Sequence, residues 1–100
     1  MDKEQVVNIA RSYKDALTSA GWNDASVYLY GSYSKGTARK DSDIDLAVVV
    51  PQMHGNWFTD VPFLWKIGRK ISDLIEPVLI EKSHPSPLYD EVLRTGISIG

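Results

Sequence analysis

Two short apolar runs in the first half of the chain bracket a glycine turn and a pair of aspartates. The first run, Val27–Tyr30, ends in Gly31-Ser32, and the second, Ile44–Val50, is entered through Asp43 and also contains Asp45. Apolar runs of this length between turn residues predict strands. A glycine directly after a strand lets the backbone turn sharply and approach a ligand closely. We therefore expect a strand, a ligand-binding turn and a second strand that begins with acids.

The spacing of the two aspartates places both on one face of the second strand. Side chains alternate between the faces of a strand, so Asp43 and Asp45 point one way while Ile44 and Leu46 point into the core. Ser42 is expected to orient the turn into this pair through a hydrogen bond. Mg²⁺ is usually held by one or two carboxylates together with substrate phosphates. The pair thus predicts a metal site that a nucleoside triphosphate would complete.

The turn after the first strand is suited to the phosphates. If a short helix begins near Ser32, its free N–H groups and the positive end of its dipole face the same place as the carboxylates. Gly31 and Ser32 are then candidates for holding the terminal phosphates. Lys35, Arg39 and Lys40 follow closely and are further candidates, although a charged loop is more often simply solvated.

The segment GSYSKGTARKDSDIDLAVVV, residues 31–50, resembles the signature of the polymerase β nucleotidyltransferase superfamily. Within it, the chain is most similar to the minimal nucleotidyltransferase family, over nearly its whole length. The resemblance implies an α+β fold, a small mixed β-sheet with helices packed on one face, as a single nucleotidyltransferase domain over 1–100. It also implies a third carboxylate on a later strand. Glu76 is the matching position and Glu81 the second candidate, although the family more often has aspartate there.

The same resemblance implies a chemistry and a biological setting. Asp43, Asp45 and Glu76 would hold Mg²⁺, as a pair of ions, while a hydroxyl group attacks the α-phosphate of ATP and pyrophosphate leaves. Glu76 would accept the proton of that hydroxyl. In the minimal nucleotidyltransferase family, AMP is transferred to a tyrosine of a HEPN-domain ribonuclease toxin. The chain would then act as a type VII-like antitoxin.

Two other functions fit the sequence. A non-catalytic antitoxin could neutralise its partner by occlusion, using apolar groups such as Trp57, Phe58 or Tyr89. An aminoglycoside-type nucleotidyltransferase would modify a small molecule, but such enzymes ordinarily carry a further helical domain for the antibiotic. A fold can also keep its site residues after catalysis is lost, so ancestry alone does not establish activity.

Composition excludes several further classes. The chain has 100 residues, 43% of them apolar, and a net charge of −2, so no basic excess makes nucleic acid an obligatory partner. With no cysteine, thiol nucleophiles, thiolate zinc sites and disulfides are excluded, and we expect a cytoplasmic protein. We expect neither a signal peptide nor a membrane span. His54 and His84 have no other ligands at suitable spacing, so no metal role is expected for them.

A second long helix follows the aspartate strand. Apolar residues at three- and four-residue spacing predict it over 58–75. Thr59 or Asp60 would cap this helix, and Pro62 is compatible only with its first turn. The other expected elements are a first helix over 6–20, a third strand over 77–81 and a short helix that begins after Ser86 and ends at Gly96.

Overall fold

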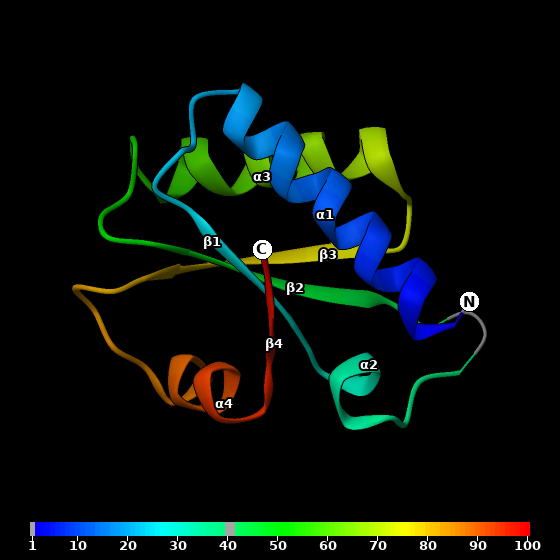
Figure 1. Ribbon diagram of the computed structural model, residues 1–100. Coiled ribbons are helices and arrows are strands. Elements are labelled where there is room, and N and C mark those ends of the chain that lie inside the picture. The colour runs from blue at the N-terminus through cyan, green and yellow to red at the C-terminus, as the bar shows by residue number, and fades with distance from the viewer. Residues whose placement is uncertain (1, 40–41) are drawn as a thin grey trace.

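The computed structural model describes residues 2–39 and 42–100 (Figure 1). The elements follow in the order α1 (Lys3–Ser19), β1 (Ser26–Tyr30), α2 (Ser32–Lys35), β2 (Ile44–Val50), α3 (Trp57–Ile71), β3 (Ile75–Glu81), α4 (Pro87–Thr95) and β4 (Ile97–Ile99). Lys40 lies outside the described residues. Within the described ranges, no helix is long and apolar enough to cross a membrane.

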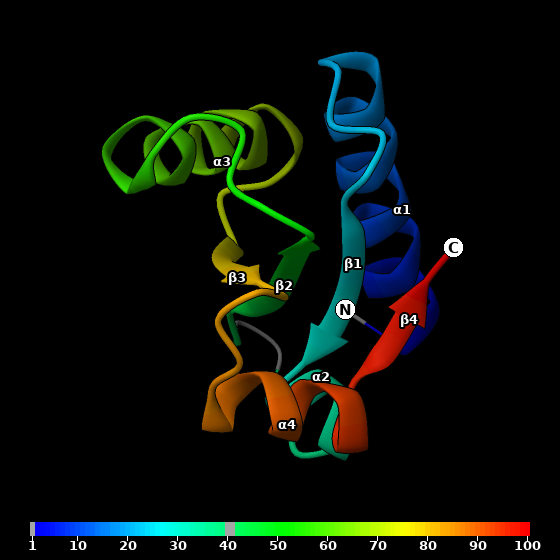
Figure 2. The same cartoon turned by 90° about the vertical axis from the view of Figure 1, so that its left-hand side faces the viewer.

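The strands form one mixed sheet in the order β3-β2-β1-β4 (Figure 2). β1 runs antiparallel to both β2 and β4, whereas β2 and β3 run parallel and are joined through α3. Parallel neighbours require a crossover connection of this kind. The starts of β2 and β3 therefore lie at the same end of the sheet, where β1 ends. The predicted α+β fold with a small mixed sheet is confirmed.

α1 and α3 lie on one face of the sheet and enclose the main core with it (Figures 1 and 2). Tyr13 of α1 is fully buried there, and its hydroxyl donates to the carbonyl of Leu64 in α3 at 3.1 Å. Gly68 allows α3 to approach the sheet, because a Cβ at this position would lie 3.1 Å from Ile75 Cγ2. The two long helices thus occupy one face, as expected.

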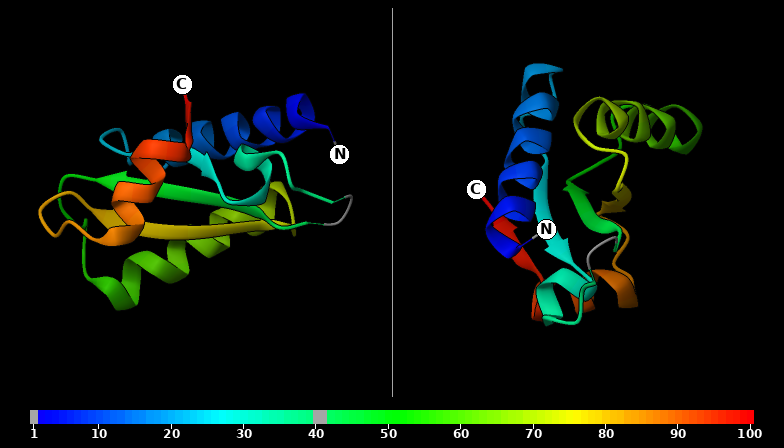
Figure 3. Two further views of the ribbon diagram at one scale, coloured as in Figure 1. Left: turned by 90° about the horizontal axis from the view of Figure 1, so that it is seen from below. Right: turned by 90° about the vertical axis from the view of Figure 1, so that its right-hand side faces the viewer.

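The opposite face carries a smaller apolar cluster beneath α4. Its buried members are Ala47, Val49, Ile80 and Val92. Seen from below, α4 crosses the later parts of β2 and β3, and α2 lies beside the end of β1 (Figure 3). Within the described part of the chain, no helix crosses the first residues of β2 and β3 on this face. The sheet is therefore open where the predicted carboxylates begin.

The start of α3 differs from the prediction. Asn56 caps the helix, since its side-chain oxygen accepts from the N–H groups of Phe58 and Thr59 at 2.9 and 3.2 Å. The expected caps at Thr59 or Asp60 are therefore wrong. Pro62 is consequently the sixth residue of α3, beyond its first turn. The N–H that proline lacks would have paired with the carbonyl of Phe58, a residue that is 85% exposed, so water can satisfy that carbonyl.

The end of α3 also differs from the prediction. The helix stops at Ile71, and Ile75 is fully buried as the first residue of β3. A single apolar residue fits the helical period of the preceding segment and the buried face of a following strand equally well. The short helix α4 begins as predicted, because Ser86 Oγ accepts from the N–H of Tyr89 at 3.2 Å.

Candidate active site

Three polar side chains from neighbouring strands meet at the open part of the sheet. Asp45 of β2 is the register partner of Tyr30 on the antiparallel side and of Glu76 on the parallel side. Register partners project to the same face of a sheet. Asp45 shares that face with Ala47 of the α4 cluster, and Asp43 precedes it by two residues. The structure thus brings Glu76, which is distant in the sequence, to Asp43 and Asp45.

Gly31 lies against this carboxylate group. Its φ of 73° and ψ of −145° belong to a region that is essentially restricted to glycine. A Cβ at this position would also overlap Asp45 Oδ2. Helix α2 begins at Ser32, as expected for this turn, and Ser34 Oγ donates to the Gly31 carbonyl at 3.0 Å. The turn is therefore held directly beside Asp45.

Loss of hydration, together with crowding of negative charge, raises the pKa values of two carboxyl groups. Loss of hydration on burial, followed by the charge of Asp43, raises the pKa of Asp45. Loss of hydration, the charges of Asp43 and Asp45, and a hydrogen bond with Asp43 raise the pKa of Glu76, against a smaller opposing effect of Arg69. These carboxyl groups repel one another, so a bound cation would stabilise them in their charged forms.

Tyr30 responds to the same charges. Burial, and then the charges of Asp45, Glu76 and Glu91, raise the pKa of Tyr30 to about 12. The phenol is consequently neutral at physiological pH. Glu91, the last of these charges, belongs to α4.

The donor set suits a hard cation. Asp43, Asp45 and Glu76 offer oxygen ligands, which Mg²⁺ prefers, and no sulfur or imidazole ligand stands among them. In the ranges 2–39 and 42–100, no group of three or more His, Cys, Asp or Glu side chains forms a ready-made metal cage. Magnesium sites of this class take part of their coordination from substrate phosphates, so the arrangement fits an ion that binds together with a nucleotide.

The predicted phosphate-binding cations have different surroundings. Lys35 Nζ lies 3.0 Å from Glu91 Oε1, which ties the end of α2 to α4. Arg39 is exposed, and its backbone N–H donates to Ser42 Oγ at 2.7 Å. Ser42 therefore orients the turn before Asp43, as predicted. Sequence reasoning missed the contact of Glu91 with Lys35, because an acid on an amphipathic helix carries no local sign of its tertiary partner.

Glu81, the second candidate for the third carboxylate, lies at the other end of β3. It pairs in register with Val50 rather than with Asp45. One oxygen accepts from the N–H of Met53 at 2.8 Å and the other lies 2.8 Å from His84 Nδ1. Glu81 thus fixes the loop after β2, and it lines a hollow of about 400 Å³ with Trp57 among its walls.

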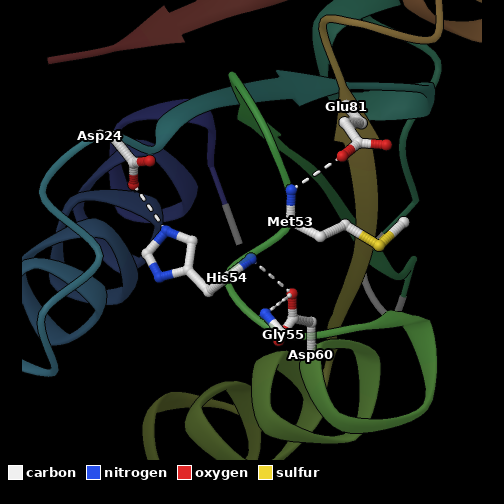
Figure 4. A network of polar contacts seen from close by, with 6 residues as sticks. All are labelled: Asp24, Met53, His54, Gly55, Asp60 and Glu81. Atoms are coloured by element: carbon white, nitrogen blue, oxygen red, sulfur yellow. Dashed lines mark hydrogen bonds and ion pairs between the residues drawn. The ribbon is translucent and has the colours of Figure 1, made fainter.

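A polar network organises the same loop (Figure 4). Asp60, which is 5% exposed, accepts from the N–H groups of His54 and Gly55 at 2.9 and 3.1 Å. The His54 ring stacks on Trp22 with centroids 4.0 Å apart, and its Nε2 lies 2.7 Å from Asp24 Oδ1. These contacts position the loop and leave the carboxylate end of the sheet untouched.

Comparison with known proteins places this arrangement in a family. The family model described as "Nucleotidyltransferase domain" matches residues 10–92. A structure described as a minimal nucleotidyltransferase is similar, with a TM-score of 0.60 and 26% identity over 97% of this chain and 95% of that one. A nucleotidyltransferase structure from Sulfolobus solfataricus gives a TM-score of 0.69 and 18% identity, over 96% of this chain and 80% of that one.

A third solved structure adds a nucleotide to the comparison. It is described as a toxin–antitoxin with AMP-PNP and gives a TM-score of 0.64 and 24% identity, over 90% of this chain and 72% of that one. No curated protein matches the chain. The family match spans most of the sequence and includes the glycine turn and the aspartate strand. The chain therefore belongs to the nucleotidyltransferase domain family, and it is a nucleotidyltransferase.

Proposed function

We propose that this nucleotidyltransferase transfers AMP from ATP to a tyrosine hydroxyl of a partner HEPN-domain ribonuclease toxin, as a type VII-like antitoxin. The observation that carries the proposal is the meeting of Asp45, Glu76 and the Gly31 turn on the open face of the sheet. The nucleotidyltransferase domain that performs this reaction comprises residues 1–100. No obligatory nucleic acid takes part, and the reaction takes place in the cytoplasm.

The residues of the site have separate roles in the proposed reaction. Asp43, Asp45 and Glu76 would hold Mg²⁺, and a pair of these ions would supply charge neutralisation at the reacting phosphate. Gly31 and Ser32 hold the β- and γ-phosphates, which fixes the α-phosphate in front of the acceptor. A bond forms between the acceptor oxygen and the α-phosphorus, and the bond from that phosphorus to pyrophosphate breaks.

Glu76 is the proposed general base. The acceptor hydroxyl must lose its proton as the new bond forms, and Glu76 takes it. In the free protein, loss of hydration and then the charges of Asp43 and Asp45 raise the pKa of Glu76. Glutamate at this position reaches further from the strand than aspartate. Glu76 is nevertheless the register partner of Asp45, so it remains within the carboxylate group.

The choice of acceptor and nucleotide rests on the family and on one neighbour. The similar toxin–antitoxin structure was obtained with AMP-PNP, which supports an adenine nucleotide as the donor. The open face of the sheet also supports a macromolecular acceptor, because no helix covers the starts of β2 and β3 in the described chain. A protein tyrosine can approach such a surface without a closed substrate pocket.

Intact-mass analysis tests the proposal directly. The purified chain, MgATP and the candidate HEPN toxin are incubated, and both proteins are weighed and mapped by peptide. We expect an AMP adduct on a toxin tyrosine that is absent with Asp43→Asn and retained with Asp15→Asn, a change at an exposed position of α1. A stable complex with no adduct would contradict the proposal.

That contrary outcome would favour the occlusion mechanism. Trp57 and Phe58 at the start of α3 are 50% and 85% exposed, so apolar surface is available for binding a partner. The double variant Asp43→Asn with Asp45→Asn separates the two mechanisms. Neutralisation of the toxin by this variant would indicate occlusion, and its loss together with retained binding would indicate AMP transfer.

A further inference from the structure

The ion pair between α2 and α4 connects the two helices that border the open face. Lys35 is the last residue of α2, four positions after Gly31, and its Nζ lies 3.0 Å from Glu91 Oε1. The Lys35 and Glu91 side chains are 48% and 39% exposed. An exposed lysine on a helix of four residues would otherwise sample many rotamers. Glu91 restricts those rotamers by pairing with the ammonium group.

Glu91 is itself fixed by the packing of α4. Val92, the next residue, is fully buried against the apolar cluster of the open face, which also contacts Tyr30. The charge of Glu91 affects Tyr30, the register partner of Asp45. The core position of Val92 therefore determines where Glu91 stands relative to Lys35.

We propose that Glu91 is a positioning residue of the nucleotide site, which holds Lys35 Nζ ready for the terminal phosphates of the bound triphosphate. This inference rests on the proposed nucleotide-binding function of the Gly31 turn. A lysine ammonium has three N–H donors, and the bond to Glu91 uses one of them. The other donors are available to phosphate oxygens, so Lys35 can bind the nucleotide without leaving Glu91.

The Lys35–Glu91 ion pair is exposed, so Glu91 can be replaced without loss of the fold. An exposed ion pair contributes little to folding, typically below about 1 kcal/mol. Removing Glu91 should therefore leave the fold intact and release Lys35 into free rotation. The nucleotide would then have to order the lysine upon binding, which weakens affinity and leaves the chemical step unchanged.

Titration with Mg·AMP-PNP by calorimetry tests the inference in a double-mutant cycle. We expect Lys35→Ala to raise Kd about tenfold, as for the loss of a charge-assisted hydrogen bond. Glu91→Gln should raise Kd about threefold in the native background, within the range for an exposed ion pair, and should have no effect in the Lys35→Ala background. In turnover, Glu91→Gln should raise KM for ATP and leave kcat unchanged.

Asp90→Asn is the matched control, because it removes one exposed charge from the same helix without touching Lys35. An unchanged or lower Kd for Glu91→Gln would overturn the inference, as would the same increase in the absence of Lys35. The native chain provides the test of the underlying function. If it binds the nucleotide and Glu91→Gln has no effect, only the inference fails. If the native chain binds no nucleotide, the proposed function and the inference fail together.

Discussion

Asp45 and Glu76 are register partners in the parallel part of the sheet, although α3 separates them in the chain. Both residues share one face with Tyr30, and the carboxyl group of Asp45 lies beside Gly31. The arrangement places like charges close together at a point where no helix of the described chain covers the sheet. Repulsion between these carboxylates lowers the stability of the free protein and favours the binding of a cation.

Gly31→Ala should abolish AMP transfer and lower the free energy of unfolding by about 1–3 kcal/mol, because alanine is strained in this conformation. The added Cβ would also overlap Asp45 Oδ2 and displace that carboxylate. Denaturant unfolding and the transfer assay measure the two effects.

Gly36→Ala is the control for this change. Gly36 also has a positive φ, 74°, but an added Cβ there meets nothing within 4 Å. It should lose about 1 kcal/mol for the left-handed conformation and keep most of its activity. Equal losses of activity in the two variants would show that glycine is needed at position 31 because of backbone strain and not because of contact with Asp45.

Without divalent cations, Asp45→Asn and Glu76→Gln should each stabilise the fold at pH 7. The pKa of both carboxyl groups is raised in the folded state. Between the unfolded and the folded pKa of each group, the folded chain therefore binds more protons than the unfolded chain. Native stability therefore falls as pH rises through this interval, and the penalty is complete above it. The advantage of the variants should disappear in acid, below the unfolded pKa values near 4.

Thermal unfolding in chelator at a series of pH values measures this effect, with Asp15→Asn as the control for a charge lost elsewhere. Adding Mg²⁺ should raise Tm of the native chain more than Tm of Asp45→Asn, because the ion binds the folded carboxylates. A destabilised Asp45→Asn at pH 7 in chelator would contradict the electrostatic account of the site.

Glu76→Gln should lower activity without unfolding the protein, whereas Glu81→Gln should lower stability without loss of activity. Glu76→Gln removes the proposed base and a metal ligand, so AMP transfer should be lost while the protein stays folded. Glu81→Gln weakens the hydrogen bond from the Met53 N–H. The free energy of unfolding should therefore fall by about 1 kcal/mol, and activity should be retained. Parallel kinetic and denaturation measurements check both. Loss of AMP transfer in a folded Glu81→Gln protein would indicate that Glu81, and not Glu76, is the third carboxylate.

Asp60→Asn should destabilise the protein by about 1–3 kcal/mol. The buried carboxylate accepts from the backbone of His54 and Gly55, and an amide has one oxygen to replace two. Asp24→Asn, at the exposed end of the His54 contact, should cost far less. Urea denaturation measures the free energy of unfolding of both variants. Equal decreases would show that the buried Asp60 carboxylate contributes no more to stability than the exposed Asp24.

Local sequence was sufficient to predict the chemistry-bearing elements. The strands around residues 27–30 and 44–50 form as predicted, because each is an apolar run between residues that disfavour strands. The glycine turn, the short helix after it and the role of Ser42 also depend on neighbouring residues alone. The boundaries of α3 were less predictable. Asn56 and Thr59 are both acceptable caps, and Ile75 fits a helix or a strand.

The sequence by itself determined the donor groups: two aspartates on one strand face and a glycine turn next to them. Tertiary structure decided which distant acids join them. Glu76 faces Asp45 and Glu81 does not, because the parallel register of β2 and β3 aligns their starts. Glu91 reaches Lys35 because burial of Val92 fixes α4 on the sheet. Register and packing depend on contacts between segments far apart in the chain, and local residue patterns do not specify those contacts.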